Sequence, residues 1–233
     1  MTDIPNNLYQ IRDEIQRYAK ACGQDTEQIR LIAVSKTHNV ESILAAASAG
    51  QRDFAENYVQ EGLEKIQKIR ALDGQIADQL CWHYIGQIQG NKCQAIATHF
   101  DWVHSLCSIK HAQRLNRLRP EACQPLQICV QVQLENKPGR GGITLADVPE
   151  FLSEICDLPQ INVRGLMCVL PEGMRGDAAY AGFSRVRDVL LEQGKAHPSL
   201  DTLSMGMSGD FREAIRAGSN MLRLGSAIFG ARG

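Results

Sequence analysis

A lysine directly follows an apolar run in the segment LIAVSKTH, residues 31–38. The run predicts a buried strand, so Lys36 stands where that strand ends. Lysine is strongly hydrated and is seldom buried without a partner. An amine in a partly apolar pocket has a lowered pKa and can attack an aldehyde. The segment therefore raises covalent aldehyde binding as one chemistry for Lys36.

Two interpretations of Lys36 stay open at this point. In the first, the lysine lies at the rim of the fold, paired with Glu56 or exposed to water. In the second, it forms a Schiff base with an aldehyde cofactor, and pyridoxal 5'-phosphate is the cofactor commonly held in this way. The second interpretation requires groups elsewhere in the chain that bind a phosphate and an aromatic ring.

Two segments rich in glycine and serine are candidates for the phosphate. SMGMSGDF (204–211) contains Ser204 and Gly206, and LRLGSAIFG (222–230) contains Gly225 and Ser226. Glycine lets backbone amides approach a ligand, and a helix start presents unpaired N–H groups to an anion. Each segment is equally compatible with a tight turn between strand and helix, which needs glycine anyway. Their occurrence after the last two predicted strands favours a phosphate site.

Arg223 lies inside the apolar strand MLRLG. It either pairs with a carboxylate across the rim or faces the ring nitrogen of a cofactor. A guanidinium stays protonated and only donates hydrogen bonds, so it would keep a pyridine nitrogen unprotonated. The ring would then be a weak electron sink.

Further polar residues are candidates for the pocket wall. Asn57 in FAENYVQE is either a helix N-cap or a ligand contact, and both roles can coexist. The segment HYIGQIQGNK adds His83, Gln87, Asn91 and Lys92. A lone histidine on a strand is more often a satisfied core residue than a ligand.

Alternating segments predict the elements that position these residues. Strands are expected at 30–35, 53–57, 82–86, 102–106, 126–134, 161–169, 202–206 and 220–225, and helices at 4–21, 40–50, 58–72, 90–99, 108–119, 146–157, 177–194 and 209–218. Strands that alternate with helices imply parallel pairing, and eight units favour a single (β/α)8 barrel over residues 1–233 with an extra N-terminal helix. A doubly wound sheet is the alternative, but the glycine-rich nucleotide motifs are missing.

Composition narrows the class of protein. The chain has 233 residues, 44% hydrophobic and 22% charged, with a net charge of −1. The sequence contains no basic block of the kind that indicates nucleic-acid binding. Neither a signal peptide nor a membrane span is visible, so we expect a cytoplasmic protein. The eight cysteines form no C-x-x-C pair, which favours reduced thiols and predicts no metal site.

The motifs AVSKTH, FAENYVQE, WHYIGQIQGNK, RGLM, LSMGMSGDF and RLGSAIFGAR, in this order, resemble those of the pyridoxal-phosphate homeostasis family. This family, also called proline synthase co-transcribed proteins, is similar to the barrel domain of bacterial alanine racemase, fold type III. The resemblance covers nearly the whole chain. One departure is Arg140, where relatives often carry a lysine, so Schiff-base exchange at that position is not expected.

The resemblance implies a role for each candidate residue. Lys36 would carry the aldimine, Arg223 would face the pyridine nitrogen, and Asn57 would lie beside the ring. Ser204, Gly206, Gly225 and Ser226 would hold the phosphate. Family members bind and buffer the cofactor with no established reaction, so apo pyridoxal-dependent enzymes are the expected recipients, and we expect a monomer.

The alternative function is a fold type III racemase. Such an enzyme needs a second base, usually a tyrosine from an added β domain, and we expect no such domain here. Tyr58 and Tyr84 come near the rim in sequence, but neither has an evident activating partner. The sequence therefore favours a carrier over a racemase.

Overall fold

The computed structural model describes residues 2–135 and 141–230. Arg140, singled out above, lies outside the described residues. Within them the strands are β1 (Arg30–Val34), β2 (Asp53–Glu56), β3 (Cys81–Tyr84), β4 (Trp102–Leu106), β5 (Leu126–Gln133), β6 (Ile143–Thr144), β7 (Ile161–Cys168), β8 (Thr202–Ser204) and β9 (Met221–Leu224).

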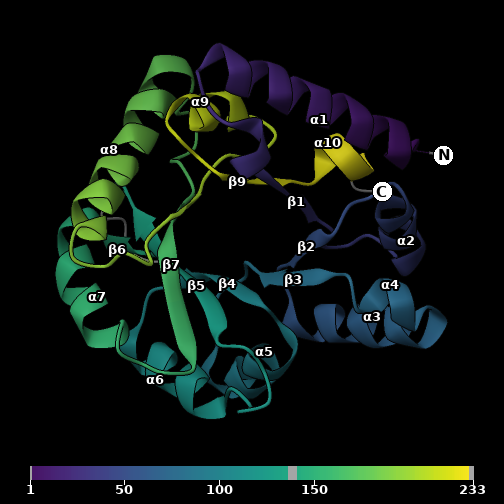
Figure 1. The fold of residues 1–233 in the computed structure, drawn as a ribbon, viewed down its shortest axis with the longest axis horizontal. Coiled ribbons are helices and arrows are strands. Elements are labelled where there is room, and N and C mark those ends of the chain that lie inside the picture. Colours follow the sequence, from purple (N-terminus) through teal and green to yellow (C-terminus); the bar gives the residue numbers. More distant parts are fainter. Residues whose placement is uncertain (1, 136–140, 231–233) are drawn as a thin grey trace.

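The strands form a closed parallel barrel. Their order is β4-β3-β2-β1-β9-β8-β7-β5, and an additional pairing of β4 with β5 closes the ring. The two-residue strand β6 pairs with the end of β5. The predicted (β/α)8 barrel is therefore confirmed, and Figure 1 shows its helices around the outside of the strands.

The helices are α1 (Ile4–Ala21), α2 (Val40–Ser48), α3 (Val59–Leu72), α4 (Gly74–Ala77), α5 (Cys93–His99), α6 (Ile109–Leu118), α7 (Val148–Ile155), α8 (Gly176–Gly194), α9 (Phe211–Arg216) and α10 (Ser226–Phe229), with short 3-10 turns at Thr26–Gln28, Gly90–Lys92 and Leu145–Asp147. The described part of the chain contains no helix that is both long and apolar enough to cross a membrane.

The predicted N-terminal helix is present as α1. Its residues Leu8, Ile11 and Ile15 recur at helical spacing and are buried, and the Asp3 side chain caps its start by accepting from the Asn6 N–H. The Asn7 amide donates to the Ile228 carbonyl in α10 at 2.9 Å. In Figure 1, α1 lies along the outside of the barrel, beside α9 and α10. This helix thus anchors the segment that follows the last strand.

Strand β8 and helix α9 are both shorter than expected. The chain turns at Gly206, where φ is +96° and an added Cβ would lie 2.7 Å from the Ala214 Cβ. Because other residues adopt this backbone conformation only with strain, glycine both ends the strand and allows α9 to pack closely. The result is a loop over residues 205–210 instead of regular structure at the rim.

The alternation of side chains in the strands separates two packed regions. Leu31 and Ala33 of β1 face the large apolar layer between strands and helices. Ile32 and Val34 point inward, into a smaller cluster with Trp102 and neighbours. The barrel interior also contains buried polar side chains, and these connect directly to the site.

Candidate functional site

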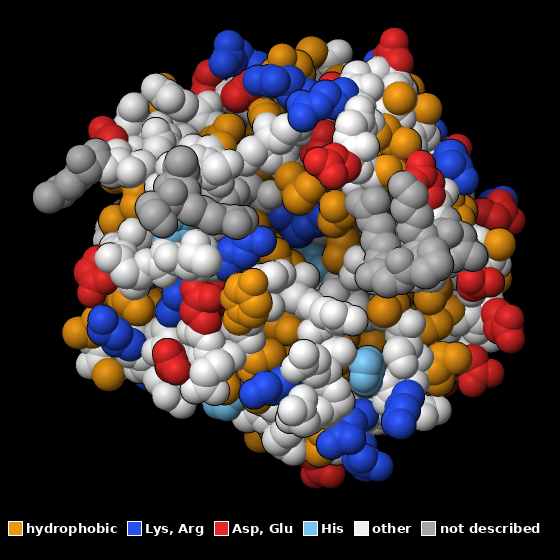
Figure 2. All heavy atoms as spheres, turned by 180° about the vertical axis from the view of Figure 1, so that it is seen from behind, with side chains coloured by type: hydrophobic (Ala, Val, Ile, Leu, Met, Phe, Trp, Pro, Cys, Tyr) orange, Lys and Arg blue, Asp and Glu red, His pale blue; other side chains and the backbone are white. Residues whose placement is uncertain are grey.

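A pocket of about 310 Å³ opens where β1 and β9 end. It is lined by Val34, Lys36, His38, Ile85, Met207, Ser208, Gly209, Arg223, Gly225, Ser226 and Gly230. Figure 2 shows a face of the molecule that is hollowed near its centre, with basic side chains and a histidine visible inside. The carboxyl ends of the strands are where barrel proteins usually bind their ligands.

Lys36 occupies a tight turn directly after β1. The His38 N–H donates to the Ser35 carbonyl at 3.0 Å, which closes the turn around Lys36 and Thr37. Thr37 has φ of +68°, and it is the one non-glycine residue with positive φ in the described chain. A β-branched residue is strained in this region, so surrounding contacts must hold the turn. A strained turn therefore presents Lys36 to the pocket.

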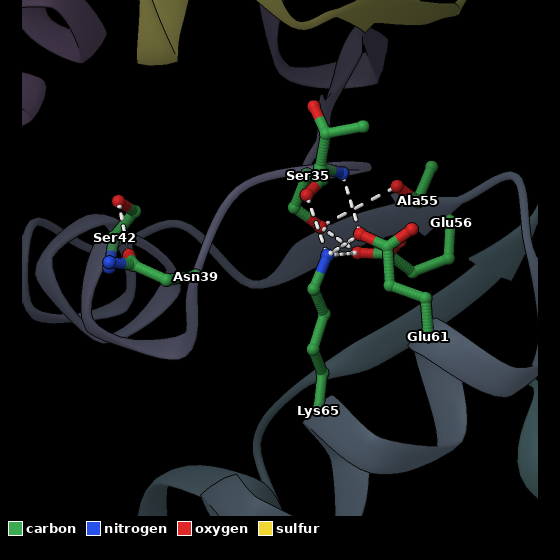
Figure 3. A network of polar contacts seen from close by, with 8 residues as sticks. Ser35, Asn39, Ser42, Ala55, Glu56, Glu61 and Lys65 are labelled. Carbon is green, nitrogen blue, oxygen red and sulfur yellow. Dashed lines mark hydrogen bonds and ion pairs between the residues drawn. The ribbon is translucent and has the colours of Figure 1, made fainter. Parts of the chain in front are cut away.

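A buried charged network beneath this turn supplies those contacts (Figure 3). Lys65 of α3 donates to the Ser35 carbonyl at 2.8 Å, to Glu56 at 2.8 Å and to Glu61 at 2.6 Å. Glu61 also accepts from the Thr37 N–H at 2.5 Å. The network therefore holds the residue before Lys36 and the residue after it. We refer to Glu56, Glu61 and Lys65 as the rim network.

Glu56 is the most buried member of the rim network. Its Oε1 accepts from the Ser35 hydroxyl at 2.6 Å and from Lys65, whereas Oε2 has no hydrogen-bond partner within the described residues. Burial raises the pKa of Glu56, although Lys65 and Ser35 oppose the shift. The sequence offered Glu56 as a partner for Lys36. In the structure, Lys65 and Ser35 hold its Oε1 atom.

Arg223 reaches the pocket from the barrel interior, where it is 4% exposed. Its Nη1 donates to the Ser204 hydroxyl at 2.6 Å and to the Ser204 carbonyl, and its Nη2 donates to the Cys168 carbonyl at 3.0 Å. Burial lowers the pKa of Arg223, yet a guanidinium remains protonated in proteins. Three of its five N–H groups are thus held by β7 and β8, and the side chain still lines the pocket.

The structure places the remaining predicted residues in three settings. Gly225 and Ser226 line the pocket with Lys36 and Arg223, and the Ser226 hydroxyl donates to Ser208 Oγ at 3.2 Å. Ser204 and Gly206 lie behind it, in contacts with Arg223. Asn57 lines a neighbouring pocket that also contains Tyr58, Tyr84, Gln87 and Lys92.

The interior contains two polar residues that sequence reasoning missed. His83 bonds through one nitrogen to Asp53 and through the other to His104, at 2.9 Å each, and His104 bonds to Ser204 at 2.7 Å. Asp53 and His104 were not singled out. The signal in the sequence is their place at inward positions of strands whose other inward residues are apolar.

Asp53, His83 and Cys81 are also close enough to suggest a metal centre, with ligand atoms within 4.8 Å. The sequence predicted no such cluster of metal-ligand types. Burial raises the pKa of the Cys81 thiol strongly, which disfavours the thiolate that a metal requires. The direct bond between His83 and Asp53 accounts for their proximity without an ion.

Comparison with known proteins defines the class first. Residues 7–233 match the model of the alanine racemase N-terminal domain. The alanine racemase of Clostridium difficile has a TM-score of 0.69 at 15% identity, with 93% of this chain and 55% of that chain covered. At this identity the likeness concerns the fold alone.

Relatives that match over their full length define the family. The pyridoxal phosphate homeostasis protein of Escherichia coli K12 is 41% identical, with 100% of this chain and 98% of the relative covered, and that of Vibrio alginolyticus is 42% identical over 100% and 99%. PipY of Synechococcus elongatus, solved with PLP bound, is 34% identical with a TM-score of 0.85, covering 98% of this chain and 100% of that one. The chain belongs to the pyridoxal phosphate homeostasis protein family.

Proposed function

We propose that this protein binds pyridoxal 5'-phosphate at the rim pocket and serves as a carrier and reservoir of the cofactor in vitamin B6 homeostasis. One observation carries the proposal: an amine, a guanidinium, a glycine and a hydroxyl from two adjacent strand ends line the same pocket, as Lys36, Arg223, Gly225 and Ser226. The names of the full-length relatives and the PLP-bound structure of PipY support it.

The residues present fit the chemical groups of the cofactor. Lys36 offers the amine that can bond to the aldehyde carbon with loss of water. Ser226 and the backbone around Gly225 offer donors for the phosphate. Arg223 offers N–H groups to the ring nitrogen, and the rim network holds the backbone on both sides of Lys36. Ser204 at the end of β8 and Gly206 in the loop after it would support the phosphate side, and Asn57 would approach from the neighbouring pocket.

When bound, the cofactor stabilises negative charge on carbon, and an enzyme exploits this with suitably placed bases. A racemase needs a base on each face of the ring. The two tyrosines near the rim do not fit that role. Burial raises the pKa of Tyr84 to about 12, and its hydroxyl donates to the Gln87 carbonyl, while Tyr58 is exposed. Arg223 would also keep the ring a weak electron sink. The carrier role therefore fits these residues better than racemisation.

The first experiment tests covalent binding. The purified protein incubated with pyridoxal 5'-phosphate should turn yellow, and borohydride should then attach the cofactor irreversibly to Lys36, as located by peptide mass spectrometry. Lys36→Ala should lose the colour but retain weaker binding through the phosphate contacts. A protein that stays colourless and unlabelled would contradict the proposal.

The second experiment separates carrier from enzyme. Amino acids incubated with the loaded protein in deuterated water should show no α-proton exchange above the rate of free cofactor. Transfer to an apo pyridoxal-dependent enzyme should proceed faster than from free cofactor at the same total concentration, with the carrier acting as a monomer in size-exclusion chromatography with light scattering. Exchange at enzymatic turnover that Lys36→Ala abolishes would favour the racemase instead.

A further inference from the structure

A continuous chain of hydrogen bonds crosses the barrel interior from the rim to the opposite end. It starts at Arg223, passes through the Ser204 hydroxyl at 2.6 Å and His104 at 2.7 Å, and continues to His83 at 2.9 Å. It ends 2.9 Å further on, at Asp53 Oδ1. We refer to these five residues as the interior relay. Each comes from a different strand, namely β9, β8, β4, β3 and β2.

The middle of the interior relay is sealed from water. His83, His104 and Ser204 are each 0% exposed. The Trp102 ring stacks on His83, with centroids 5.8 Å apart and planes 17° apart, and the Arg30 and Arg164 guanidinium groups lie over the same indole ring. Solvent cannot replace a missing donor or acceptor here. Each donor in the interior relay must therefore face an acceptor on the next residue.

The two ends of the interior relay determine the direction of its protons. A guanidinium only donates, so the Ser204 hydroxyl must accept from Arg223. An ionised carboxylate only accepts, so His83 must donate to Asp53. A neutral imidazole has one donor and one acceptor nitrogen. His83 therefore donates through Nε2 and accepts at Nδ1, His104 likewise donates through Nε2, and the Ser204 hydroxyl proton fills His104 Nδ1.

The opposite order is disfavoured. It would turn an unprotonated His83 nitrogen toward the Asp53 carboxylate and would leave the Ser204 proton without its histidine acceptor. Both orders require neutral rings, and the buried setting of the two histidines favours that state. Burial lowers the pKa of His83 despite Asp53, and burial together with His83, Arg223 and Arg30 lowers the pKa of His104 well below its usual value. Although burial opposes it, the bond from His83 lowers the pKa of Asp53.

We propose that Asp53, His83 and His104 are positioning residues, which order the protons of the interior relay so that Ser204 presents a lone pair to Arg223 and holds its guanidinium in place for the cofactor ring nitrogen. The link to the ring nitrogen rests on the proposed function. The proton order itself does not. Since the guanidinium does not release a proton, the relay positions Arg223 and does not conduct protons to the ring.

The proton order can be read without any cofactor. In the ligand-free protein labelled with 15N, both His83 and His104 should show the neutral pattern with the proton on Nε2. Asp53→Asn replaces an obligatory acceptor with an amide that can either accept or donate, so an Nδ1-protonated fraction should appear in both rings. Asp101→Asn is the matched control, because Asp101 carries the same charge near His83 but accepts from the Trp82 backbone N–H. It should leave both tautomers unchanged.

The second arm tests the link to Arg223. Asp53→Asn should weaken binding of pyridoxal 5'-phosphate roughly tenfold, equivalent to about 1.4 kcal/mol or one hydrogen bond. The 1-deaza analogue has carbon in place of the ring nitrogen, so it should bind the wild type more weakly than the cofactor does. Its affinity for Asp53→Asn should equal its affinity for the wild type. Asp101→Asn should change neither affinity.

Each outcome decides a defined part of the proposal. Charged or Nδ1-protonated histidines in the wild type would overturn the proton order. Unchanged tautomers in Asp53→Asn would show that Asp53 does not set that order. Equal losses for the cofactor and its deaza analogue, or no loss for either, would overturn the link to Arg223. If neither ligand binds the wild-type protein, the proposed function fails, whereas the NMR result still decides the proton order.

Discussion

The two cations that line the pocket are supported in opposite ways. The rim network contains a buried lysine between two carboxylates, and it contacts the backbone on both sides of Lys36. The interior relay consists of neutral imidazoles and a hydroxyl between one carboxylate and one guanidinium, and it holds the Arg223 side chain itself. Charge is therefore concentrated in the first network and separated to the ends of the second.

This difference matches what each cation must do in the proposed carrier. Lys36 has to form and release a covalent bond with the aldehyde, and the rim network holds the backbone on both sides of it. Arg223 must keep one charge state and one orientation, so its N–H groups are held directly. A network of charges suits the first task, because strong bonds offset the strain at Thr37. A neutral relay suits the second, since added buried charges would be costly.

The largest expected effect concerns the centre of the rim network. Lys65→Met removes the cation that pairs with two carboxylates, which are 0% and 27% exposed, so it should destabilise the fold by about 3–5 kcal/mol, as uncompensated buried charges do. Urea unfolding of the two proteins at neutral pH measures the difference.

Lys68→Met is the matched control on the same helix. Lys68 pairs with Glu41 at 3.4 Å, and both side chains are more than half exposed, so its loss should cost no more than about 1 kcal/mol. Equal losses for the two variants would show that the rim network adds nothing beyond an exposed ion pair, and the contrast drawn above would disappear.

The second prediction uses pH to separate the two networks. The folded-state pKa values of His83 and His104 are lowered, chiefly by burial, so unfolding takes up protons below about pH 6.5, the ordinary histidine value. The stability that depends on neutral histidines is complete above that pH and is lost as pH falls toward the folded pKa values. The free energy of unfolding should fall by as much as about 1.4 kcal/mol per pH unit for each histidine.

The rim network should respond in the opposite direction. The pKa of Glu56 is raised by burial, so its contribution is complete below the ordinary glutamate value of about 4.5 and declines as pH rises through the folded value. Glu56→Gln should therefore leave the loss of stability below pH 6.5 in place, whereas His104→Gln should reduce its slope. The reverse pattern would assign the acid sensitivity to the rim network.

The third prediction concerns Ser226, which lines the pocket but belongs to neither network. Ser226→Ala removes one hydroxyl donor from the proposed phosphate site, so cofactor binding should weaken by about 1–3 kcal/mol, the range for a hydrogen bond to a charged group. Binding of pyridoxal, which has no phosphate, should be unaffected, and the urea midpoint should hardly change. Equal weakening for both ligands would place the phosphate elsewhere.

The barrel fold and the residues that line the rim pocket were predictable from the sequence, because both follow from local patterns. The alternation of strands and helices predicted the closed sheet, and Lys36, Arg223, Gly225 and Ser226 each stand beside a strand end, where parallel strands of one barrel meet. The two networks were not predictable in this way. Their bonds join residues up to 100 positions apart, as in His104 with Ser204, and depend on register and side-chain direction across several strands.

The smallest expected effect lies in the turn itself and tests why the rim network is charged. Thr37→Gly removes a strained β-branched residue from φ of +68° but adds chain freedom to the unfolded state, so the net change in stability should stay within about 1 kcal/mol. With the strain gone, the turn depends less on the Glu61 carboxylate that accepts from its N–H. Glu61→Gln should therefore cost less stability in the Thr37→Gly background than in the wild type, because part of the bond energy no longer offsets strain. A double-mutant cycle by urea unfolding measures this coupling. Additive effects would mean that the network holds Lys36 without opposing strain, and the contrast with the interior relay would then rest on charge alone.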